Sequence, residues 1–230
     1  NVSHEFKTPL AVIYNNAQLL QKSVSADSEQ ADYVESILDS TKRLSNLIQN
    51  MLKLNKLEKQ TIQPMPETYD VCAQLCDCII QFDDSMEKKN IDFEADMEDA
   101  AYICADPGLM ELVWNNLMSN ALKFTPDGGK IRLLQKRDEN YIHISVSDNG
   151  CGMDSEVMKH IFDKFYQGDE SHATYGNGLG LALVKRVLEL SAGHITVESK
   201  PKKGTTFTVF MPIAGNVMDM QQDRTENETV

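Results

Sequence analysis

A histidine with an acidic neighbour lies near the start of the chain, in the run His4-Glu5-Phe6-Lys7-Thr8-Pro9. A side-chain pKa of about 6.5 leaves imidazole largely neutral at neutral pH, so one ring nitrogen keeps a lone pair that can attack a phosphorus atom. Glu5 can take or orient the proton on the other nitrogen, which distinguishes His4 from an ordinary surface histidine at a helix start. Thr8 follows one helical turn later on the same face, where its hydroxyl can hold a water molecule. Pro9 should bend the helix there, because it cannot donate a hydrogen bond to the carbonyl of Glu5.

Two asparagines, Asn116 and Asn120, are four residues apart in the helical run NLMSNALKF. This spacing makes both amides project from one face of the helix. Amide oxygens are hard ligands that can share Mg²⁺ with nucleotide phosphates and water, and Lys123 continues the same side toward the phosphates. Asparagine is a poor residue inside a helix, so capping or solvated asparagines are the weaker interpretation. The sequence therefore predicts a magnesium site at Asn116 and Asn120.

The run Asp148-Asn149-Gly150-Cys151-Gly152-Met153 follows a predicted strand. A carboxylate at a strand end is well placed to accept a hydrogen from the amino group of adenine. Gly150 and Gly152 let the backbone approach the base closely. Asp-Asn-Gly alone is more often an ordinary turn, but here a helix follows instead of a returning strand. This favours a nucleotide-binding loop.

Alternating glycines open a later helix in the run Gly176-Asn177-Gly178-Leu179-Gly180. They expose backbone N–H groups and the positive end of the helix dipole toward phosphates. A dinucleotide-binding fold would need its glycines directly after a strand in a parallel repeat, whereas this run follows a polar loop. We expect that loop, Gln167 to Tyr175, to be a mobile lid. Phe162 and Phe165 just before it are equally consistent with core packing, and we assign them to anchoring the lid.

A helical hairpin must position the histidine. From Phe6 to Leu20 the apolar residues have a 4-3-4-3 spacing, and a second apolar stripe from Val34 to Leu54 predicts an amphipathic helix of about 30 residues. The polar segment KSVSADS between them predicts an antiparallel turn. Two helices alone bury little more than one stripe, so we expect a second copy to complete a four-helix bundle in a homodimer.

An α+β domain with helices on one face of a mixed sheet must position the other motifs. We expect the hairpin at residues 1–58, a proline-containing linker at 59–66, the α+β domain at 67–213 and a disordered tail at 214–230. The expected helices are 71–86, 107–124, a short helix after the Asp148 run and 179–190, and the expected strands are 91–95, 101–104, 130–137, 141–148, 194–199 and 205–211.

In this order and spacing, the five motifs resemble those of the sensor histidine kinases of two-component systems, and they span nearly all of residues 1–212. The resemblance implies an α/β sandwich ATP-binding domain of the superfamily that includes gyrase and chaperone ATPases. It makes His4 the phospho-acceptor, Glu5 its acidic partner and Thr8 the residue that holds a water for dephosphorylating a partner. The implied ATP-binding residues are Asn116, Asn120, Lys123, Phe124, Asp148, Gly150, Gly152, Met153, Phe165, Gly176, Gly178, Leu179 and Gly180.

The resemblance implies Mg-ATP-dependent autophosphorylation of His4, transfer of the phosphoryl group to an aspartate of a response regulator, and a regulator phosphatase activity. One rival is an ATPase of the same superfamily. In those enzymes the position that resembles Asn116 is a glutamate that activates water, and an asparagine cannot act as a base. The other rival is an inactive scaffold, which the intact glycine, asparagine and aspartate positions disfavour. Gln167 and His172 stand where many family members have basic lid residues, so we expect weaker ATP binding than is usual.

Composition limits the kinds of partner and the cellular compartment. A net charge of −13 and the lack of a basic patch disfavour nucleic acid as a partner. No apolar run approaches the roughly 20 residues that a membrane-spanning helix needs. The five cysteines form no Cys-x-x-Cys pair and have no histidine at ligand spacing, which disfavours a metal site and favours a reducing compartment. The resemblance to the sensor histidine kinases implies a full-length protein that is anchored in the plasma membrane by segments upstream of this one, with this part in the cytosol.

Overall fold

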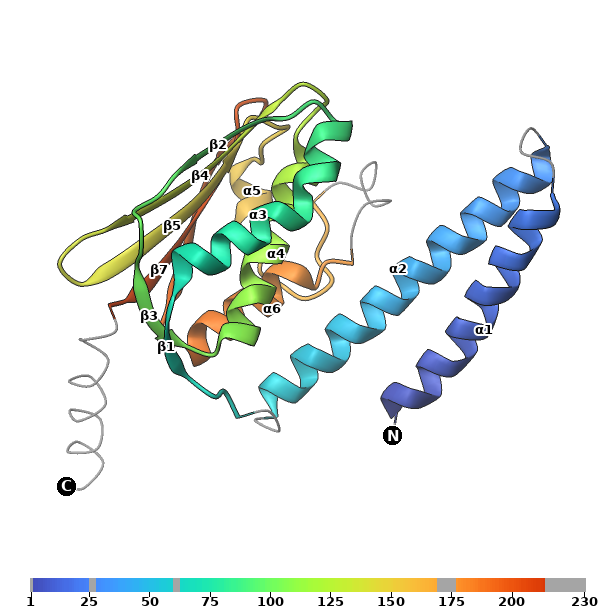
Figure 1. Cartoon of the computed structure of the whole chain (residues 1–230), viewed down its shortest axis with the longest axis horizontal. Coiled ribbons are helices and arrows are strands. Elements are labelled where there is room, and N and C mark those ends of the chain that lie inside the picture. The colour runs from blue at the N-terminus through green and yellow to red at the C-terminus, as the bar shows by residue number, and fades with distance from the viewer. Residues whose placement is uncertain (1, 25–27, 60–62, 169–176, 214–230) are drawn as a thin grey trace.

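The computed structural model describes residues 2–24, 28–59, 63–168 and 177–213. Two helices, α1 (Val2–Ser23) and α2 (Glu29–Glu58), form an antiparallel hairpin that projects from an α/β domain (Figure 1). Ser28 caps α2 by accepting a hydrogen bond from the backbone N–H of Ala31. Glu29 and Asp32 place negative charge in the first turn, where the helix dipole favours it.

The hairpin buries only a narrow stripe of side chains. Ala17, Val34 and Leu38 form a small buried cluster against which Tyr14 packs. Several large apolar side chains of the two helices stay exposed: Phe6, Val12, Ile13, Leu19, Leu20, Ile37, Leu44 and Met51. Although both helices are long, no described helix carries the apolar stretch that would be needed to cross a membrane.

Five strands form the main sheet of the α/β domain, in the order β2-β4-β5-β7-β6. They are β2 (Asp92–Asp96), β4 (Lys130–Arg137), β5 (Tyr141–Asp148), β7 (Gly204–Pro212) and β6 (His194–Lys200). β2 and β4 are parallel and the other neighbours are antiparallel. Burial alternates along β4 and β5, as expected for a sheet with one covered face. The mixed sheet and the helical N-terminal region confirm the predicted α+β class.

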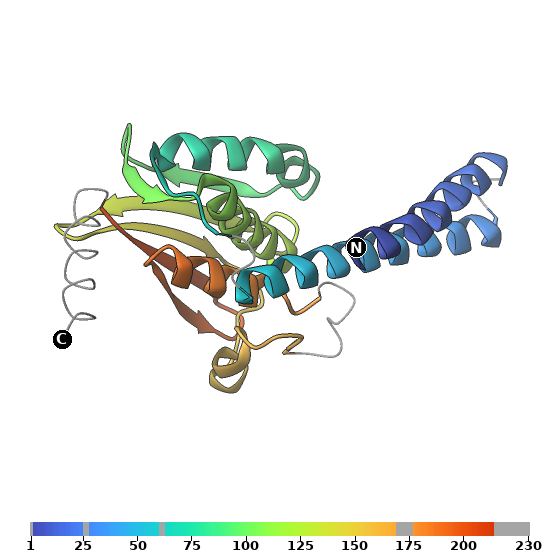
Figure 2. The same cartoon turned by 90° about the horizontal axis from the view of Figure 1, so that it is seen from below.

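Three helices cover one face of this sheet: α3 (Val71–Lys88), α4 (Pro107–Phe124) and α6 (Gly180–Leu190) (Figures 1 and 2). The short α5 (Ser155–His160) follows β5. Trp114 of α4 is fully buried at the centre of the core, and its ring N–H donates to Gln74 of α3 at 2.9 Å. The bond satisfies the one polar atom that Trp114 takes into the core.

A second, two-stranded sheet was not predicted. β1 (Glu67–Asp70) pairs antiparallel with β3 (Tyr102–Ala105). Asp70 ends β1, and its carboxylate accepts hydrogen bonds from the N–H groups of Cys72 and Ala101, both at 3.0 Å. These contacts explain why a four-residue, half-exposed segment without alternating hydrophobicity becomes a strand. The tail at 214–230 and part of the segment expected to be a linker lie outside the described residues.

Candidate functional site

The acceptor motif lies in the first turns of α1. His4 and Glu5 belong to the helix, but their side chains lie outside what the structure describes. Thr8 is exposed one turn later, and Pro9 lies inside the helix. The roles assigned to His4, Glu5 and Thr8 therefore stay predictions.

Asn116 and Asn120 lie on α4, and both are half-buried. Their four-residue spacing in this helix places them on the same face, as predicted. The side-chain amide of Asn116 donates to the carbonyl of Leu112 at 2.6 Å. Its Oδ1 faces the first residue of α6, so that a Cβ atom added to Gly180 would lie 2.5 Å from that oxygen. A Cβ atom at residue 180 would thus displace the Asn116 side chain, and the close approach brings the predicted magnesium ligand to the N-terminus of α6.

The chemistry of this donor set suits a hard cation. Since the amide nitrogen of Asn116 is engaged by Leu112, Oδ1 is the atom left to bind a ligand. Among the described residues no group of three or more histidine, cysteine, aspartate or glutamate side chains could hold a metal ion. The sharing of Mg²⁺ between these two asparagines, nucleotide phosphates and water stays a prediction from the sequence.

Asp148 ends β5 and is followed by the predicted adenine loop. The N–H of Gly150 donates to its Oδ1 at 2.8 Å. Burial raises the pKa of the Asp148 carboxyl, and the hydrogen bonds from the backbone of Gly150 and Thr205 only partly offset this effect. A desolvated carboxylate with one oxygen engaged can still accept a further hydrogen bond from a base.

Gly150 and Gly152 have a packing role that the sequence did not reveal. A Cβ atom at Gly150 would overlap the carbonyl oxygen of Phe124, at the end of α4. Gly152 has φ +63°, and a Cβ atom there would overlap the carbonyl of Lys200. The loop is therefore held between the end of α4 and the turn that joins β6 to β7.

The glycine run before α6 is closely joined to the preceding aromatic motif. Phe165 donates its backbone N–H to the carbonyl of Gly178 at 2.8 Å, and a Cβ atom at Gly178 would overlap the backbone of Phe165. Leu179 is buried in the core. Phe162 packs against the core, whereas the Phe165 side chain is 55% exposed. Gly176, His172 and most of the predicted lid lie outside the described residues.

A cavity of about 570 Å³ lies between the end of α4 and the Asp148 loop, a size typical of small-molecule sites. It is lined by Lys89, Lys123, Phe124, Thr125, Pro126, Asn149, Gly150, Cys151 and Lys202. The Lys123 ammonium lies 4.2 Å from the centre of the Phe124 ring, and burial lowers its pKa. Three lysines around one cavity of an otherwise acidic protein favour an anionic ligand.

Three residues that position this site were missed from the sequence. Lys89 donates its ammonium hydrogens to the carbonyls of Leu122 and Thr125, at 2.8 and 2.6 Å, and so caps the C-terminal end of α4. Gly204 has φ +96°, and a Cβ atom there would overlap the carbonyl of Asp148. Ser199 accepts a hydrogen bond from the N–H of Met153. Only Gly204, next to a lysine-rich turn, left any signal in the sequence.

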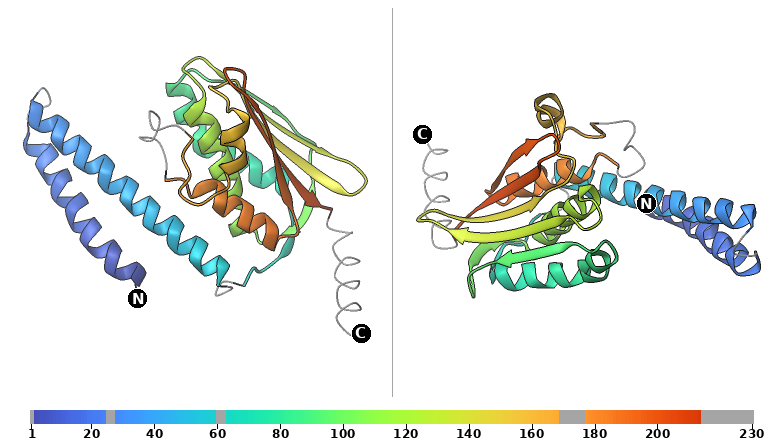
Figure 3. Two further views of the ribbon diagram at one scale, coloured as in Figure 1. Left: turned by 180° about the vertical axis from the view of Figure 1, so that it is seen from behind. Right: turned by 90° about the horizontal axis from the view of Figure 1, so that it is seen from above.

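The hairpin contacts the α/β domain through α2, which lies between α1 and that domain (Figures 1 and 3). Leu54 and Leu57 are buried in the core of the domain. Arg186 of α6 donates to the carbonyl of Leu57 at 3.3 Å, and Lys164 forms a 2.6 Å ion pair with Glu58. In this arrangement the helix that carries His4 lies on the far side of α2 from the candidate nucleotide site.

Two protein families match the chain. Residues 1–60 match the His Kinase A (phospho-acceptor) domain, and residues 105–215 match the family of histidine kinase-, DNA gyrase B- and HSP90-like ATPases. The first match contains the motif of His4, and the second contains the asparagine, aspartate and glycine motifs.

Similar proteins are sensor kinases. The sensor-like histidine kinase SenX3 of Mycobacterium tuberculosis is 31% identical over 214 residues, which are 92% of this chain and 52% of SenX3. The phosphate regulon sensor protein PhoR of Pseudomonas aeruginosa is 33% identical over 211 residues, 90% of this chain and 48% of PhoR. The chain thus spans about half the length of these relatives.

Solved structures share the fold. Full-length ShkA in complex with AMPPNP superposes with a TM-score of 0.75 and 28% identity over 93% of this chain and 45% of ShkA. Histidine kinase ThkA, solved in complex with the response regulator TrrA, superposes with a TM-score of 0.68 and 21% identity over 93% of this chain and 60% of ThkA. The second likeness concerns the fold alone.

Proposed function

This chain belongs to the sensor histidine kinases of two-component systems, and we propose that it transfers the γ-phosphoryl group of ATP to His4 and then to an aspartate of a response regulator. The observation that carries the proposal is that one chain contains both a phospho-acceptor hairpin and an ATPase-type domain. The test is incubation with γ-labelled ATP and Mg²⁺, which should give acid-labile label on the protein and little free phosphate.

ATP binding is assigned to four parts of the site. Asp148 accepts a hydrogen bond from the adenine amino group, with Gly150, Gly152, Met153 and Phe124 around the base. Lys123 and the backbone of Gly178, Leu179 and Gly180 at the start of α6 bind phosphates. Phe165 belongs to the lid side of the site, and Gly176, outside the described residues, is assigned to phosphate binding by its motif alone. Asn116 and Asn120 would hold Mg²⁺, which would neutralise negative charge on the phosphates.

In the transfer step a ring nitrogen of His4 attacks the γ-phosphorus, the bond from phosphorus to the bridging oxygen breaks, and ADP leaves. Glu5 takes or orients the proton of the other ring nitrogen. Correct alignment supplies most of the acceleration. Since α2 separates α1 from the site, either the ATP-binding domain leaves its place on α2 or the acceptor is His4 of the partner subunit.

The rival function, ATP hydrolysis, is disfavoured by Asn116. Its amide has no basic lone pair, and its nitrogen already donates to Leu112, so it cannot deprotonate water. A ratio of free phosphate to protein-bound phosphate well above one in a single turnover would favour the ATPase.

The partner we propose is the receiver domain of a response regulator; histidine kinase ThkA was solved in complex with the response regulator protein TrrA. The same hairpin would also dephosphorylate the regulator. Because the relatives are sensor proteins about twice as long, we infer that this part works in the cytosol and that further segments supply sensing and a membrane anchor.

Thr8→Ala should separate the two activities. Attack by His4 needs no hydroxyl at residue 8, whereas hydrolysis of the regulator's acyl phosphate needs a water held in line. We expect labelling of His4 within a few-fold of wild type and dephosphorylation of the regulator slowed about ten-fold or more. Both assays run on one protein preparation. Equal loss of both activities would make Thr8 structural, and unchanged dephosphorylation would contradict its role.

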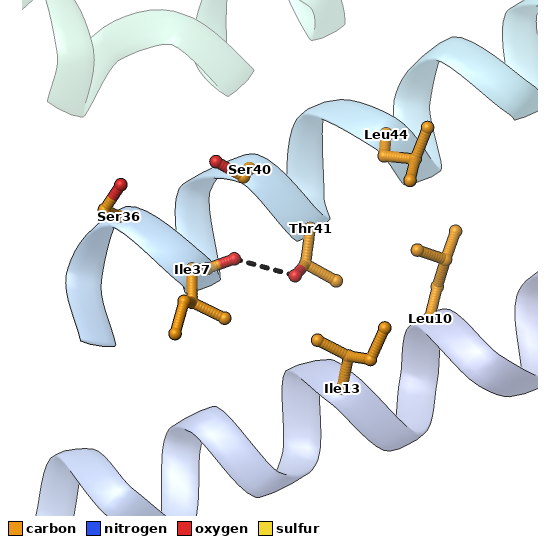
Figure 4. A pocket seen from close by; sticks show the side chains of 7 residues that line it. All are labelled: Leu10, Ile13, Ser36, Ile37, Ser40, Thr41 and Leu44. Atoms are coloured by element: carbon orange, nitrogen blue, oxygen red, sulfur yellow. Dashed lines mark hydrogen bonds between the residues drawn. The ribbon is translucent and has the colours of Figure 1, made fainter. Parts of the chain in front are cut away.

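We also propose a homodimer that pairs the apolar faces of two hairpins. Leu10 and Ile13 of α1 face Ile37, Thr41 and Leu44 of α2 around a hollow of about 240 Å³ (Figure 4). The hydroxyl of Thr41 donates to the carbonyl of Ile37 at 2.7 Å, so it adds little polarity to this face. Ile13, Ile37 and Leu44 are 43–47% exposed in the single chain. A second hairpin would bury these side chains by adding its two helices to complete a four-helix bundle.

Ile37→Glu should therefore give a monomer in sedimentation experiments, because it places a charge inside the proposed bundle. The side chain is exposed in the single chain, so the fold should survive. Ile80→Glu on α3 is the matched control, since Ile80 is 71% exposed outside the hairpin, and it should leave the dimer intact. Dimers of equal strength for both variants would contradict the proposed interface.

A further inference from the structure

Ser199 of β6 has all the hydrogen-bonding capacity of its hydroxyl engaged at the base of the Asp148 loop. It accepts a hydrogen bond from the N–H of Met153 at 2.8 Å and donates to the carbonyl of Gly204 at 3.0 Å. Its oxygen also lies 2.9 Å from the hydroxyl of Thr205. A hydroxyl has one hydrogen and two lone pairs, so Thr205 must donate this third bond.

These bonds join the Asp148 loop to the turn between β6 and β7. Backbone contacts support the same junction: Lys202 donates its N–H to the carbonyl of Cys151 at 2.6 Å, and Gly152 fits against the carbonyl of Lys200. At the other end of the loop, Gly204 fits against the carbonyl of Asp148. Ser199 adds a side-chain contact to these backbone contacts, and it lies 46 residues from Met153 in the sequence.

The loop needs such support because of its own composition. Gly150 and Gly152 make its backbone unusually free in the unfolded chain, so ordering it costs more entropy than for other residues. The N–H of Met153 is the first donor after Gly152. Fixing it to β6 fixes the end of the loop on the rigid sheet.

We propose that Ser199 is a positioning residue of the nucleotide site, which holds the loop from Gly150 to Met153 so that Asp148 and Met153 meet the adenine base. The inference rests on the proposed function, since it assumes that this loop binds adenine. Ser199 does not line the cavity and acts through the loop. Its loss should therefore weaken binding of the base and leave the phosphoryl-transfer step at His4 unchanged.

The test compares Ser199→Ala, Ser199→Thr and wild type in the full chain. Ser199→Ala should raise the Kd for ADP with Mg²⁺ about three- to ten-fold, the range for losing one hydrogen-bonded group, and raise KM for ATP with kcat little changed. Amide exchange of residues 150–153 without nucleotide should become faster. Ser199→Thr keeps the hydroxyl and suits a strand, so it should restore both properties.

Ser145→Ala is the matched control, because the Ser145 hydroxyl forms the same kind of bond with Thr208 at 2.9 Å on β5 and β7, away from the loop. It should leave ADP binding unchanged. Unaltered exchange of the loop in Ser199→Ala, or equal weakening by Ser145→Ala, would overturn the inference. If wild type itself fails to bind ADP, the proposed function fails with it; wild-type binding with an unaffected Ser199→Ala removes only the role of Ser199.

Discussion

His4→Gln is expected to abolish acid-labile labelling of the protein from γ-labelled ATP. The glutamine amide nitrogen shares its lone pair with the carbonyl group, so it cannot attack phosphorus as a neutral imidazole does. ADP binding should be unchanged, because every residue assigned to the nucleotide lies in the α/β domain. The measurement pairs phosphate incorporation with calorimetry of ADP binding on the same preparation. Label that persists in His4→Gln would place the acceptor elsewhere.

His160→Gln is the matched control for this experiment. His160 of α5 also has acidic neighbours, since its Nδ1 lies 2.8 Å from Asp163 and its Nε2 lies 3.7 Å from Glu156. His160 follows the Asp148 loop in the α/β domain and does not belong to the acceptor motif of His4. Wild-type labelling in His160→Gln, together with none in His4→Gln, would show that an acidic neighbour alone does not make an acceptor.

The regular elements of the fold could be predicted because their signals are local. β4 and β5 alternate apolar and polar residues, and α4 begins where Asp106 caps it and Pro107 occupies its first turn. β1 was missed because its stability comes from β3 and from the bonds of Asp70, about 30 residues along the chain. Such pairing leaves no pattern within the strand itself.

The candidate site also combines residues with local sequence signals and residues that act through long-range contacts. Residues that would contact a nucleotide stand in compact motifs, so Asn116, Asp148 and Gly180 could be selected from the sequence through the resemblance of those motifs to the histidine kinase family. The residues that hold those motifs in place act over long separations: Lys89 reaches Thr125, and Ser199 reaches Met153. The sequence also could not reveal that Gly180 lies directly against the side chain of Asn116.

Asp148→Asn is expected to raise the Kd for ADP about ten-fold or more. A carboxylate accepts a charge-assisted hydrogen bond from the adenine amino group, and an amide oxygen makes a weaker one. The N–H of Gly150 can still donate to the remaining oxygen, so the loop should keep its shape. Calorimetry of ADP binding measures the effect, and unchanged affinity would remove the adenine role from Asp148.

The pH dependence of stability can show that the weaker ADP binding of Asp148→Asn does not result from unfolding. Burial raises the pKa of Asp148 in the folded protein, so between the ordinary and the raised value the folded state binds more protons than the unfolded state. The contribution of Asp148 to the free energy of unfolding therefore falls as pH rises through this window, and the ionised carboxylate destabilises the protein at neutral pH. The amide introduced by Asp148→Asn does not titrate, so this variant should be at least as stable as wild type at neutral pH despite its weaker ADP binding.

Asp154→Asn is the matched control for net charge. It removes the same charge six residues later and keeps a good cap for α5, where the Asp154 side chain accepts hydrogen bonds from the backbone N–H groups of Glu156 and Val157. That control should bind ADP as wild type does; a matching loss in Asp154→Asn would reduce the effect at Asp148 to net charge.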